Sequence, residues 1–243
     1  MKSRKGVHIL PSLFTTGNVF CGFYSFIAAL NDKFLLAAWA IVLATIFDFL
    51  DGRIARMTKT TSDFGMQYDS LADVISFGMA PAFLCYAWVL KPFGRIGWMA
   101  AFLYLLCAAL RLARFNTVKE VQSQYFVGLA TPAAAAVIAS ILIAFEDLFG
   151  SRVHPGFMVA IVYILAFLMV SNIKYPAFKK FEFRKRVSFT RFLLVILVLY
   201  ALATIPKIAL FIISFGYTML GPIVAFSFQK NNLNAVSDNI KFP

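Results

Sequence analysis

Long apolar runs recur along nearly the whole chain and are separated by short polar stretches. Each run is long enough for a helix to cross a hydrocarbon core about 30 Å thick. We predict about eight such spans, near residues 12–31, 34–56, 70–90, 96–115, 128–146, 156–173, 190–205 and 208–226. Only Ile205, Pro206 and Lys207 separate the last two, which form either a tight helical hairpin or one long kinked helix. The pattern predicts an all-α integral membrane protein.

The composition agrees with this prediction. Of the 243 residues, 61% are hydrophobic and 14% are charged, whereas soluble domains are roughly 45–50% apolar and about 25% charged. A basic cluster before the first apolar run resembles the start of a signal peptide. That run is about 20 residues long and contains Asn18 and Gly22, so we interpret it as a retained membrane helix.

The formal net charge of +12 raises the possibility of nucleic-acid binding. The Lys and Arg residues lie between apolar runs and form no binding stripe, so we expect no nucleic-acid partner. With the N-terminus in the cytoplasm, eighteen of the 23 Lys and Arg residues fall on the cytoplasmic side, where positive loops are retained. Both termini are therefore predicted to be cytoplasmic. The most basic segment, residues 174–191, is expected to anchor this topology and to attract anionic lipid headgroups.

The cysteines and histidines indicate no catalytic centre of their own. Cys21, Cys85 and Cys107 stand singly in apolar runs, without metal-ligand spacing, and are expected to be small core residues. His8 and His154 are predicted on opposite sides of the membrane, so they cannot form a shared nucleophilic site.

Four of the 11 acidic residues have a regular spacing at the ends of two predicted spans: Asp48, Asp51, Asp69 and Asp73. The first two are i and i+3 and the last two are i and i+4, so each pair shares one helix face. If the two helices are antiparallel neighbours across a turn at 57–68, the faces meet. Four close carboxylates repel unless cations neutralise them, and oxygen ligands favour Mg²⁺, Mn²⁺ or Ca²⁺. The alternative is a set of solvated helix caps, as we expect for Asp63.

The residues between these carboxylates suit a phosphate site. Gly52 and Gly65 remove side chains where a ligand needs close backbone approach, and Ala55 keeps the same helix face small. Arg56 offers bidentate geometry for phosphate oxygens. Two metals and an arginine would stabilise the charge of an in-line phosphoryl displacement.

The string Asp48-x-x-Asp51-Gly52-x-x-Ala55-Arg56, eight further residues, then Gly65-x-x-x-Asp69-x-x-x-Asp73 resembles the signature of the CDP-alcohol phosphotransferase family at all its fixed positions. The resemblance implies a membrane-embedded transferase with a six-helix core and a homodimeric assembly. Such enzymes move a phosphatidyl or similar group from a CDP-linked donor to an alcohol and release CMP. It also implies that the four aspartates share two divalent metals, Mg²⁺ or Mn²⁺, and that Asp73 deprotonates the acceptor.

Four further strings are similar to the phosphatidylserine synthase branch of this family: "LPSLFTTGNVFCGFYSF" (10–26), "SLADVISFGMAPA" (70–82), "RLARFN" (111–116) and "GLATPAAAA" (128–136). Ser12 departs from the asparagine that is usual in that branch. The resemblance implies CDP-diacylglycerol as donor and L-serine as acceptor. Glycerol 3-phosphate is the alternative acceptor, which would make the product phosphatidylglycerophosphate.

A serine acceptor is a zwitterion whose carboxylate needs a cation or another donor. Arg111 and Arg114 are i and i+3, and Asn116 follows just beyond; with Ser76 they are our candidates for binding serine. The alternative is that both arginines snorkel at a membrane boundary, and an anionic acceptor would also suit them.

Thr15 and Asn18 are candidates for binding CDP-diacylglycerol, together with Gly52, Ala55, Arg56 and Gly65. Thr and Asn also serve as ordinary hydrogen-bonding residues between membrane helices.

The predicted organisation is a six-helix membrane core over residues 1–189, a C-terminal transmembrane hairpin over 190–228 and a cytoplasmic tail over 229–243. The expected location is the inner (cytoplasmic) membrane of a bacterium or archaeon. A cation transporter is the alternative of another class, and it predicts acidic residues near mid-membrane and broken helices.

Overall fold

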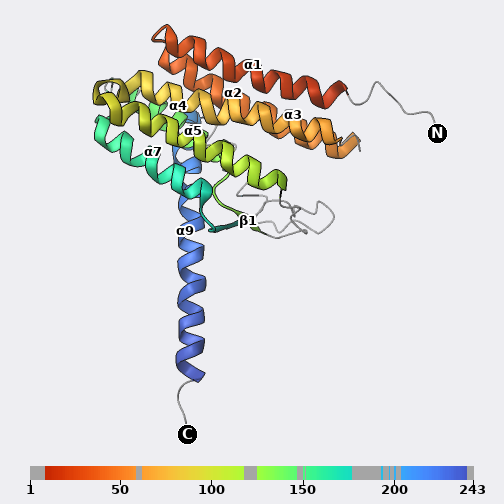
Figure 1. Cartoon of the computed structure of the whole chain (residues 1–243), viewed down its shortest axis with the longest axis vertical. Coiled ribbons are helices and arrows are strands. Elements are labelled where there is room, and N and C mark those ends of the chain that lie inside the picture. The colour runs from red at the N-terminus through yellow and green to blue at the C-terminus, as the bar shows by residue number, and fades with distance from the viewer. Residues whose placement is uncertain are drawn as a thin grey trace, which may run out of the picture.

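The computed structural model describes residues 9–58, 62–117, 125–146, 150, 152–176, 193, 197, 200 and 204–239 of the chain. Within this part, helices α1, α2, α3, α5 and α7 run alongside one another, and α9 runs across them and extends beyond the bundle (Figure 1). The prediction of an all-α membrane fold is confirmed for the spanning segments. Two strands of three residues each, which the sequence analysis missed, are the exception.

The first two helices form a closely packed pair. Helix α1 (Ile9–Leu30) and helix α2 (Phe34–Thr58) are joined by a tight turn in which Asp32 has a φ of 57°. Small buried residues line both helices: Ala28, Ala29, Ala37, Ala38 and Ala44. Small side chains let membrane helices approach closely, which favours dispersion contacts between them. The pair therefore holds the α1 and α2 side chains of the site in fixed relation.

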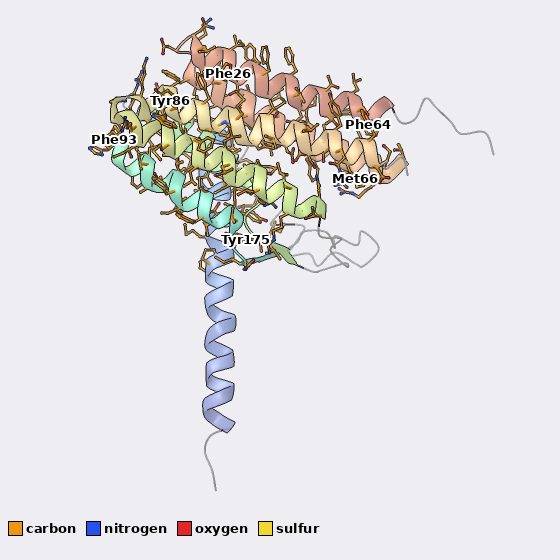
Figure 2. The ribbon with its side chains drawn as sticks, in the orientation of Figure 1. Phe26, Phe64, Met66, Tyr86, Phe93 and Tyr175 are labelled. Carbon is orange, nitrogen blue, oxygen red and sulfur yellow. The ribbon has the colours of Figure 1, made fainter. Side chains whose placement is uncertain are left out.

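The third span is one continuous helical path with changes of register. It passes through α3 (Asp63–Asp73), the π-helix η1 (Val74–Met79), α4 (Ala80–Cys85) and the π-helix η2 (Tyr86–Leu90). A 3₁₀ turn, η3 (Lys91–Phe93), leads into α5 (Gly94–Thr117). Figure 2 shows Phe64 and Met66 near one end of the bundle and Phe93 near the opposite end. The path thus crosses the whole bundle before the chain turns back.

The start of this span corrects one expectation. The sequence analysis placed a turn at 57–68 and began the span at residue 70, whereas α3 begins at Asp63. The hydroxyl of Ser62 accepts a 3.0 Å hydrogen bond from the amide of Gly65, so Ser62 caps the helix. The early start places Asp69 well inside a helix rather than at its edge.

The next two helices are shorter than predicted. Helix α6 covers Thr131–Ala144 and α7 covers Pro155–Val170. The segments beside them pair instead as strands, β1 (Tyr125–Val127) with β2 (Lys174–Pro176), in antiparallel register. Gly128 has a φ of 79° beside this pair, a conformation that favours glycine. The strand pair joins the segment before α6 to the segment after α7.

Helix α9 (Pro206–Asn239) docks on α6 and β2 through buried polar groups. The hydroxyls of Ser140 and Ser214 are 2.9 Å apart, and the hydroxyl of Tyr175 donates to the carbonyl of Thr218 at 3.3 Å. Burial raises the pKa of Tyr175 to about 12, so this hydroxyl keeps its proton. A side chain at position 221 would collide with the Tyr175 ring, so Gly221 makes room for it.

Helix α9 continues to Asn239, through most of the segment predicted as a tail. The predicted seventh span, 190–205, lies mostly outside the described residues, so the hairpin stays a prediction.

The described residues contain four helices long and apolar enough to cross a membrane: Pro11–Leu30, Phe34–Thr58, the path Asp63–Thr117, and Pro206–Ile223. Large apolar side chains such as Phe20, Phe49 and Phe102 are exposed, as expected for surfaces that face lipid.

Candidate active site

Helices α2 and α3 bring the predicted carboxylates together. One carboxylate oxygen from each of Asp48, Asp51 and Asp69 lies within 4.8 Å of the other two. Asp73, the last residue of α3, lies beside Asp48, close enough for the two carboxyl groups to share a proton. The two acidic faces therefore meet, and each pair shares one helix face as its i, i+3 or i, i+4 spacing predicts.

Asp48, Asp51 and Asp69 form a set of carboxylates that fits a hard divalent cation, with Asp73 beside them. Asp51 and Asp73 are buried, Asp48 and Asp69 are half-buried, and Oδ1 of Asp69 is buried without a hydrogen-bond partner among the described residues. Carboxylates held this close and partly away from water repel one another strongly. Protons or cations between them relieve the repulsion, and a set made only of carboxylate oxygens suits Mg²⁺, Mn²⁺ or Ca²⁺.

Helix α1 supplies hydrogen-bond donors to two of the carboxylates. The hydroxyl of Thr15 donates to Oδ2 of Asp51 at 2.9 Å, and Nδ2 of Asn18 donates to Oδ1 of Asp73 at 3.4 Å. Both α1 side chains are buried. The sequence analysis expected Thr15 and Asn18 at the donor lipid. The structure places them against the acidic cluster, where they orient Asp51 and Asp73, and Thr15 also lines the neighbouring pocket. A role of Thr15 and Asn18 in binding the donor lipid stays a prediction.

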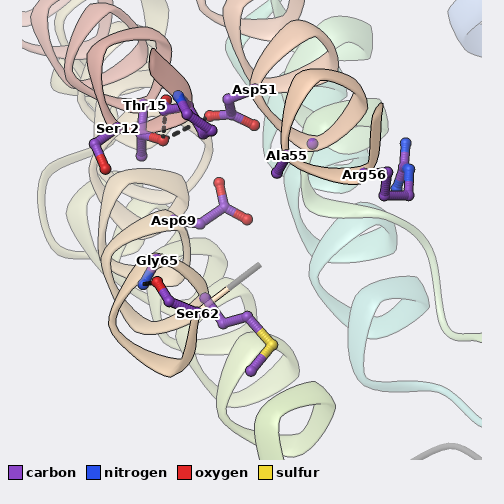
Figure 3. Close-up of a pocket in the computed structure, with 11 residues that line it drawn as sticks. Ser12, Thr15, Asp51, Ala55, Arg56, Ser62, Gly65 and Asp69 are labelled. Carbon is purple, nitrogen blue, oxygen red and sulfur yellow. Dashed lines mark hydrogen bonds between the residues drawn. The ribbon is translucent and has the colours of Figure 1, made fainter. Parts of the chain in front are cut away.

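A pocket opens beside the cluster (Figure 3). Its described lining consists of Pro11, Ser12, Thr15, Asp51, Gly52, Ala55, Arg56, Ser62, Gly65, Met66 and Asp69. A Cβ added at Gly52 would have Nη1 of Arg56 as its nearest neighbour, at 3.9 Å, so the backbone at this position is open. Figure 3 shows Asp51 and Asp69 on facing helices and Arg56 further along α2. Every residue predicted to surround a phosphate group lines this one pocket.

The pocket also contains residues that the sequence analysis did not assign. Pro11, Ser12, Ser62 and Met66 line it. Ser12 was noted only as a departure from a family string. Their position follows from the approach of α1 and α3 to α2, which spacing along one helix does not reveal.

Two of the residues predicted to bind serine connect helices instead. Nη2 of Arg114 donates to Oδ1 of Asn172 at 2.8 Å, which ties α5 to the segment after α7. Nδ2 of Asn116 donates to the hydroxyl of Ser70 at 3.0 Å, which ties the end of α5 to α3. Neither side chain belongs to the described lining of the pocket.

The other two serine candidates are also outside that lining. Arg111 is half-buried on α5. Ser76 is fully buried, and its hydroxyl donates to the carbonyl of Asn18 at 2.9 Å. A role of Arg111, Arg114, Asn116 and Ser76 in serine binding stays a prediction.

The sequence model of the CDP-alcohol phosphatidyltransferase family matches residues 8–171. The chain belongs to this family. The match runs from the first helix to the residue after α7. All four carboxylates and the whole described lining of the pocket lie within the matched residues. Helix α9 lies outside the match.

Three relatives within the CDP-alcohol phosphatidyltransferase family carry the name CDP-diacylglycerol–serine O-phosphatidyltransferase. The protein of Helicobacter pylori is 38% identical over 233 residues, which cover 93% of this chain and 97% of the relative. The protein of Bacillus subtilis is 32% identical over 174 residues, which cover 72% and 93%. The protein of Methanocaldococcus jannaschii is 40% identical over 139 residues, which cover 57% and 62%. The resemblance of the eight signature positions to this family is confirmed.

Proposed function

We propose that this protein is a transferase that moves the phosphatidyl group of CDP-diacylglycerol to the hydroxyl of L-serine and releases CMP. The observation that carries the proposal is the meeting of the Asp48, Asp51 and Asp69 carboxylates beside a pocket with an open glycine backbone. The names of the relatives in Helicobacter pylori and Bacillus subtilis support serine as the acceptor.

The donor binds with its diphosphate at the acidic cluster and its acyl chains in lipid. Gly52 leaves the backbone open to the nucleotide end, Gly65 and Ala55 place no large side chain in the pocket lining, and the exposed Arg56 pairs with a phosphate oxygen. The exposed apolar side chains of the surrounding helices face the acyl chains, which is consistent with a substrate that stays in the bilayer.

Asp48, Asp51, Asp69 and Asp73 would hold divalent cations, two in number and either Mg²⁺ or Mn²⁺. When bound, such cations stabilise the negative charge on a diphosphate as Lewis acids. Thr15 and Asn18 keep Asp51 and Asp73 in a fixed orientation through the hydrogen bonds they donate. Hydrogen-bonded outer partners of this kind tune metal ligands.

Asp73 accepts the proton of the serine hydroxyl. The hydroxyl oxygen then forms a bond to the phosphorus that carries diacylglycerol, while the bond from that phosphorus to the CMP oxygen breaks. Transfer of a proton to a positioned base contributes about 10²–10⁴-fold to such a rate. Arg111, Arg114, Asn116 and Ser76 are the proposed partners of the serine carboxylate and ammonium groups.

We also propose the topology and assembly that the charge pattern and the family resemblance support. Both termini and the acidic cluster face the cytoplasm, and the membrane is the inner membrane of a bacterium or archaeon. The core covers residues 1–189, a transmembrane hairpin covers 190–228, a cytoplasmic tail covers 229–243, and two chains form a homodimer.

An acceptor panel tests the function. Purified protein in lipid nanodiscs is given CDP-diacylglycerol and Mn²⁺ with L-serine, glycerol 3-phosphate or inositol phosphate, and CMP and the lipid product are measured. We expect CMP and phosphatidylserine with L-serine. Release of CMP only with glycerol 3-phosphate would contradict the choice of acceptor, and cation flux into proteoliposomes without any CMP would favour a transporter.

A further inference from the structure

The helical register changes directly after Asp73. The six residues that follow, Val74–Met79, form the π-helix η1. In a regular α-helix the carbonyl of residue 77 accepts a hydrogen bond from the amide of residue 81. Residue 81 is Pro81, which has no amide hydrogen. The carbonyl of Phe77 therefore lacks its α-helical donor, which leaves it the amide five residues on, that of the π-helical register, and side-chain donors.

The hydroxyl of Tyr104 on α5 is such a side-chain donor. It lies 3.2 Å from the carbonyl oxygen of Phe77, and both residues have 0% of their surface exposed. Bulk water therefore has no access to replace the hydroxyl. The contact ties the π-helical segment to α5 at the position where Pro81 breaks the regular hydrogen-bond ladder.

The same segment is fixed to α1. The hydroxyl of Ser76 donates to the carbonyl of Asn18 at 2.9 Å, and a Cβ added at Gly22 would lie 2.8 Å from Cα of Ser76. The side chain of Asn18 in turn donates to Asp73. Asp73 is thus the last α-helical residue before a segment that two neighbouring helices hold in place.

We propose that Tyr104 is a positioning residue for Asp73. Its hydroxyl holds η1 in the π-helical register in which Asp73 meets both Asp48 and Asn18. A change between the π and α registers rotates the residues before the segment relative to those after it. Short π-helical turns inside α-helices are frequent at functional sites. The proposal rests on the proposed role of Asp73 as the base.

The substitution Tyr104→Phe removes one hydroxyl and keeps the ring, and Tyr175→Phe is its matched control. Tyr175 is also 0% exposed and donates to a backbone carbonyl, that of Thr218, at 3.3 Å. Each variant therefore loses one buried hydrogen bond of the same kind. The Tyr175 bond holds α9, whereas the Tyr104 bond holds the segment after Asp73.

The experiment measures kcat and KM for CDP-diacylglycerol in nanodiscs, with saturating L-serine and Mn²⁺, and the thermal unfolding midpoint of each variant. Misplacing a catalytic group by about 1 Å can cost about 100-fold in rate, and we expect Tyr104→Phe to lower kcat by about this factor while KM for CDP-diacylglycerol stays unchanged. We expect Tyr175→Phe to shift the unfolding midpoint similarly and to retain the wild-type kcat. A wild-type kcat in Tyr104→Phe, or an equal loss in Tyr175→Phe, would overturn the proposal.

Two further arms keep the test decisive. If the wild-type protein releases no CMP with serine, the proposed function fails; the same comparison of variants is then made with the acceptor that does support release. If Tyr104→Phe does not fold, Pro81→Ala takes its place, because an amide at position 81 competes with Tyr104 for the Phe77 carbonyl. A lower kcat at unchanged KM in Pro81→Ala supports the proposal, and an unchanged kcat overturns it.

Discussion

The hydroxyl of Thr15 on α1 donates a 2.9 Å hydrogen bond to Oδ2 of Asp51 on α2. Both side chains are buried, so the bond fixes how the carboxylate faces Asp48 and Asp69. Helix α1 carries no acidic residue of its own, yet it determines the orientation of a candidate metal ligand.

Replacing Thr15 with valine should weaken metal binding without changing the shape of the helix. Loss of an outer partner typically costs about 10–100-fold in metal affinity or activity, so we expect Thr15→Val to raise the Mn²⁺ concentration for half-maximal CMP release by this factor. Thr16→Val is the control, because the exposed Thr16 hydroxyl bonds the Ser12 carbonyl at 2.7 Å and the Tyr68 hydroxyl at 3.0 Å, and no carboxylate of the described residues. An equal shift in both variants would contradict this role of Thr15.

Gly52→Ala should weaken binding of CDP-diacylglycerol without lowering the stability of the fold. The nearest atom to an added Cβ is Nη1 of Arg56 at 3.9 Å, which is ordinary contact, so the unfolding temperature should not fall. The methyl group enters the pocket, and we expect KM for CDP-diacylglycerol to rise about 10-fold, equivalent to about 1.4 kcal/mol. Gly216→Ala on α9, where an added Cβ meets no described atom within 4 Å, should leave KM unchanged. An unchanged KM in Gly52→Ala would place the donor elsewhere.

Gly22→Ala should destabilise the protein through a backbone clash. The added Cβ would lie 2.8 Å from Cα of Ser76, so α1 and η1 must move apart. Overpacking of this kind costs about 1–3 kcal/mol, measured as a lower midpoint in a chemical unfolding series. Gly17→Ala on the same helix meets only the Phe47 ring, at 3.1 Å, which a side-chain shift relieves. A larger loss in Gly17→Ala than in Gly22→Ala would contradict the close approach of α1 and η1.

Asp73→Asn should remove the proposed base while keeping the size of the side chain. We expect CMP release to fall by about 10²–10⁴-fold, the usual contribution of a positioned base. Asp63→Asn is the control, because Asp63 is exposed in the first turn of the same helix. Wild-type turnover in Asp73→Asn would exclude Asp73 from the reaction.

Much of the fold could be predicted from hydropathy. The α2 span, predicted at 34–56, is observed at Phe34–Thr58, because an apolar run of that length has few alternatives to a membrane helix. The register changes at η1 and η2 could not be predicted, since one extra residue in a turn hardly alters a hydrophobic pattern. Pro81, just after η1, and Pro92, just after η2, were local signs of them. The strands β1 and β2 depend on contact between segments far apart in the chain, which hydropathy does not encode.

Some features of the candidate site could likewise be predicted from the sequence, and others could not. The spacings within Asp48/Asp51 and Asp69/Asp73 were sufficient to predict one acidic face on each of two helices, and the structure brings those faces together. The hydrogen bonds from Thr15 and Asn18 to that cluster depend on how α1 packs, which the sequence leaves open. The serine candidates Arg111 and Arg114 were chosen by charge and by resemblance, and neither criterion locates a side chain relative to a pocket.

Direct Mn²⁺ binding tests the central claim, that the joined acidic faces of α2 and α3 hold divalent cations. Purified protein is titrated with Mn²⁺ and free Mn²⁺ is followed by electron paramagnetic resonance, without any substrate. The account predicts two bound Mn²⁺ per chain in the wild type and in Asp63→Asn, with binding lost or greatly weakened in Asp48→Asn and Asp69→Asn. Absence of stoichiometric binding in the wild type, or undiminished binding in Asp48→Asn and Asp69→Asn, would contradict it.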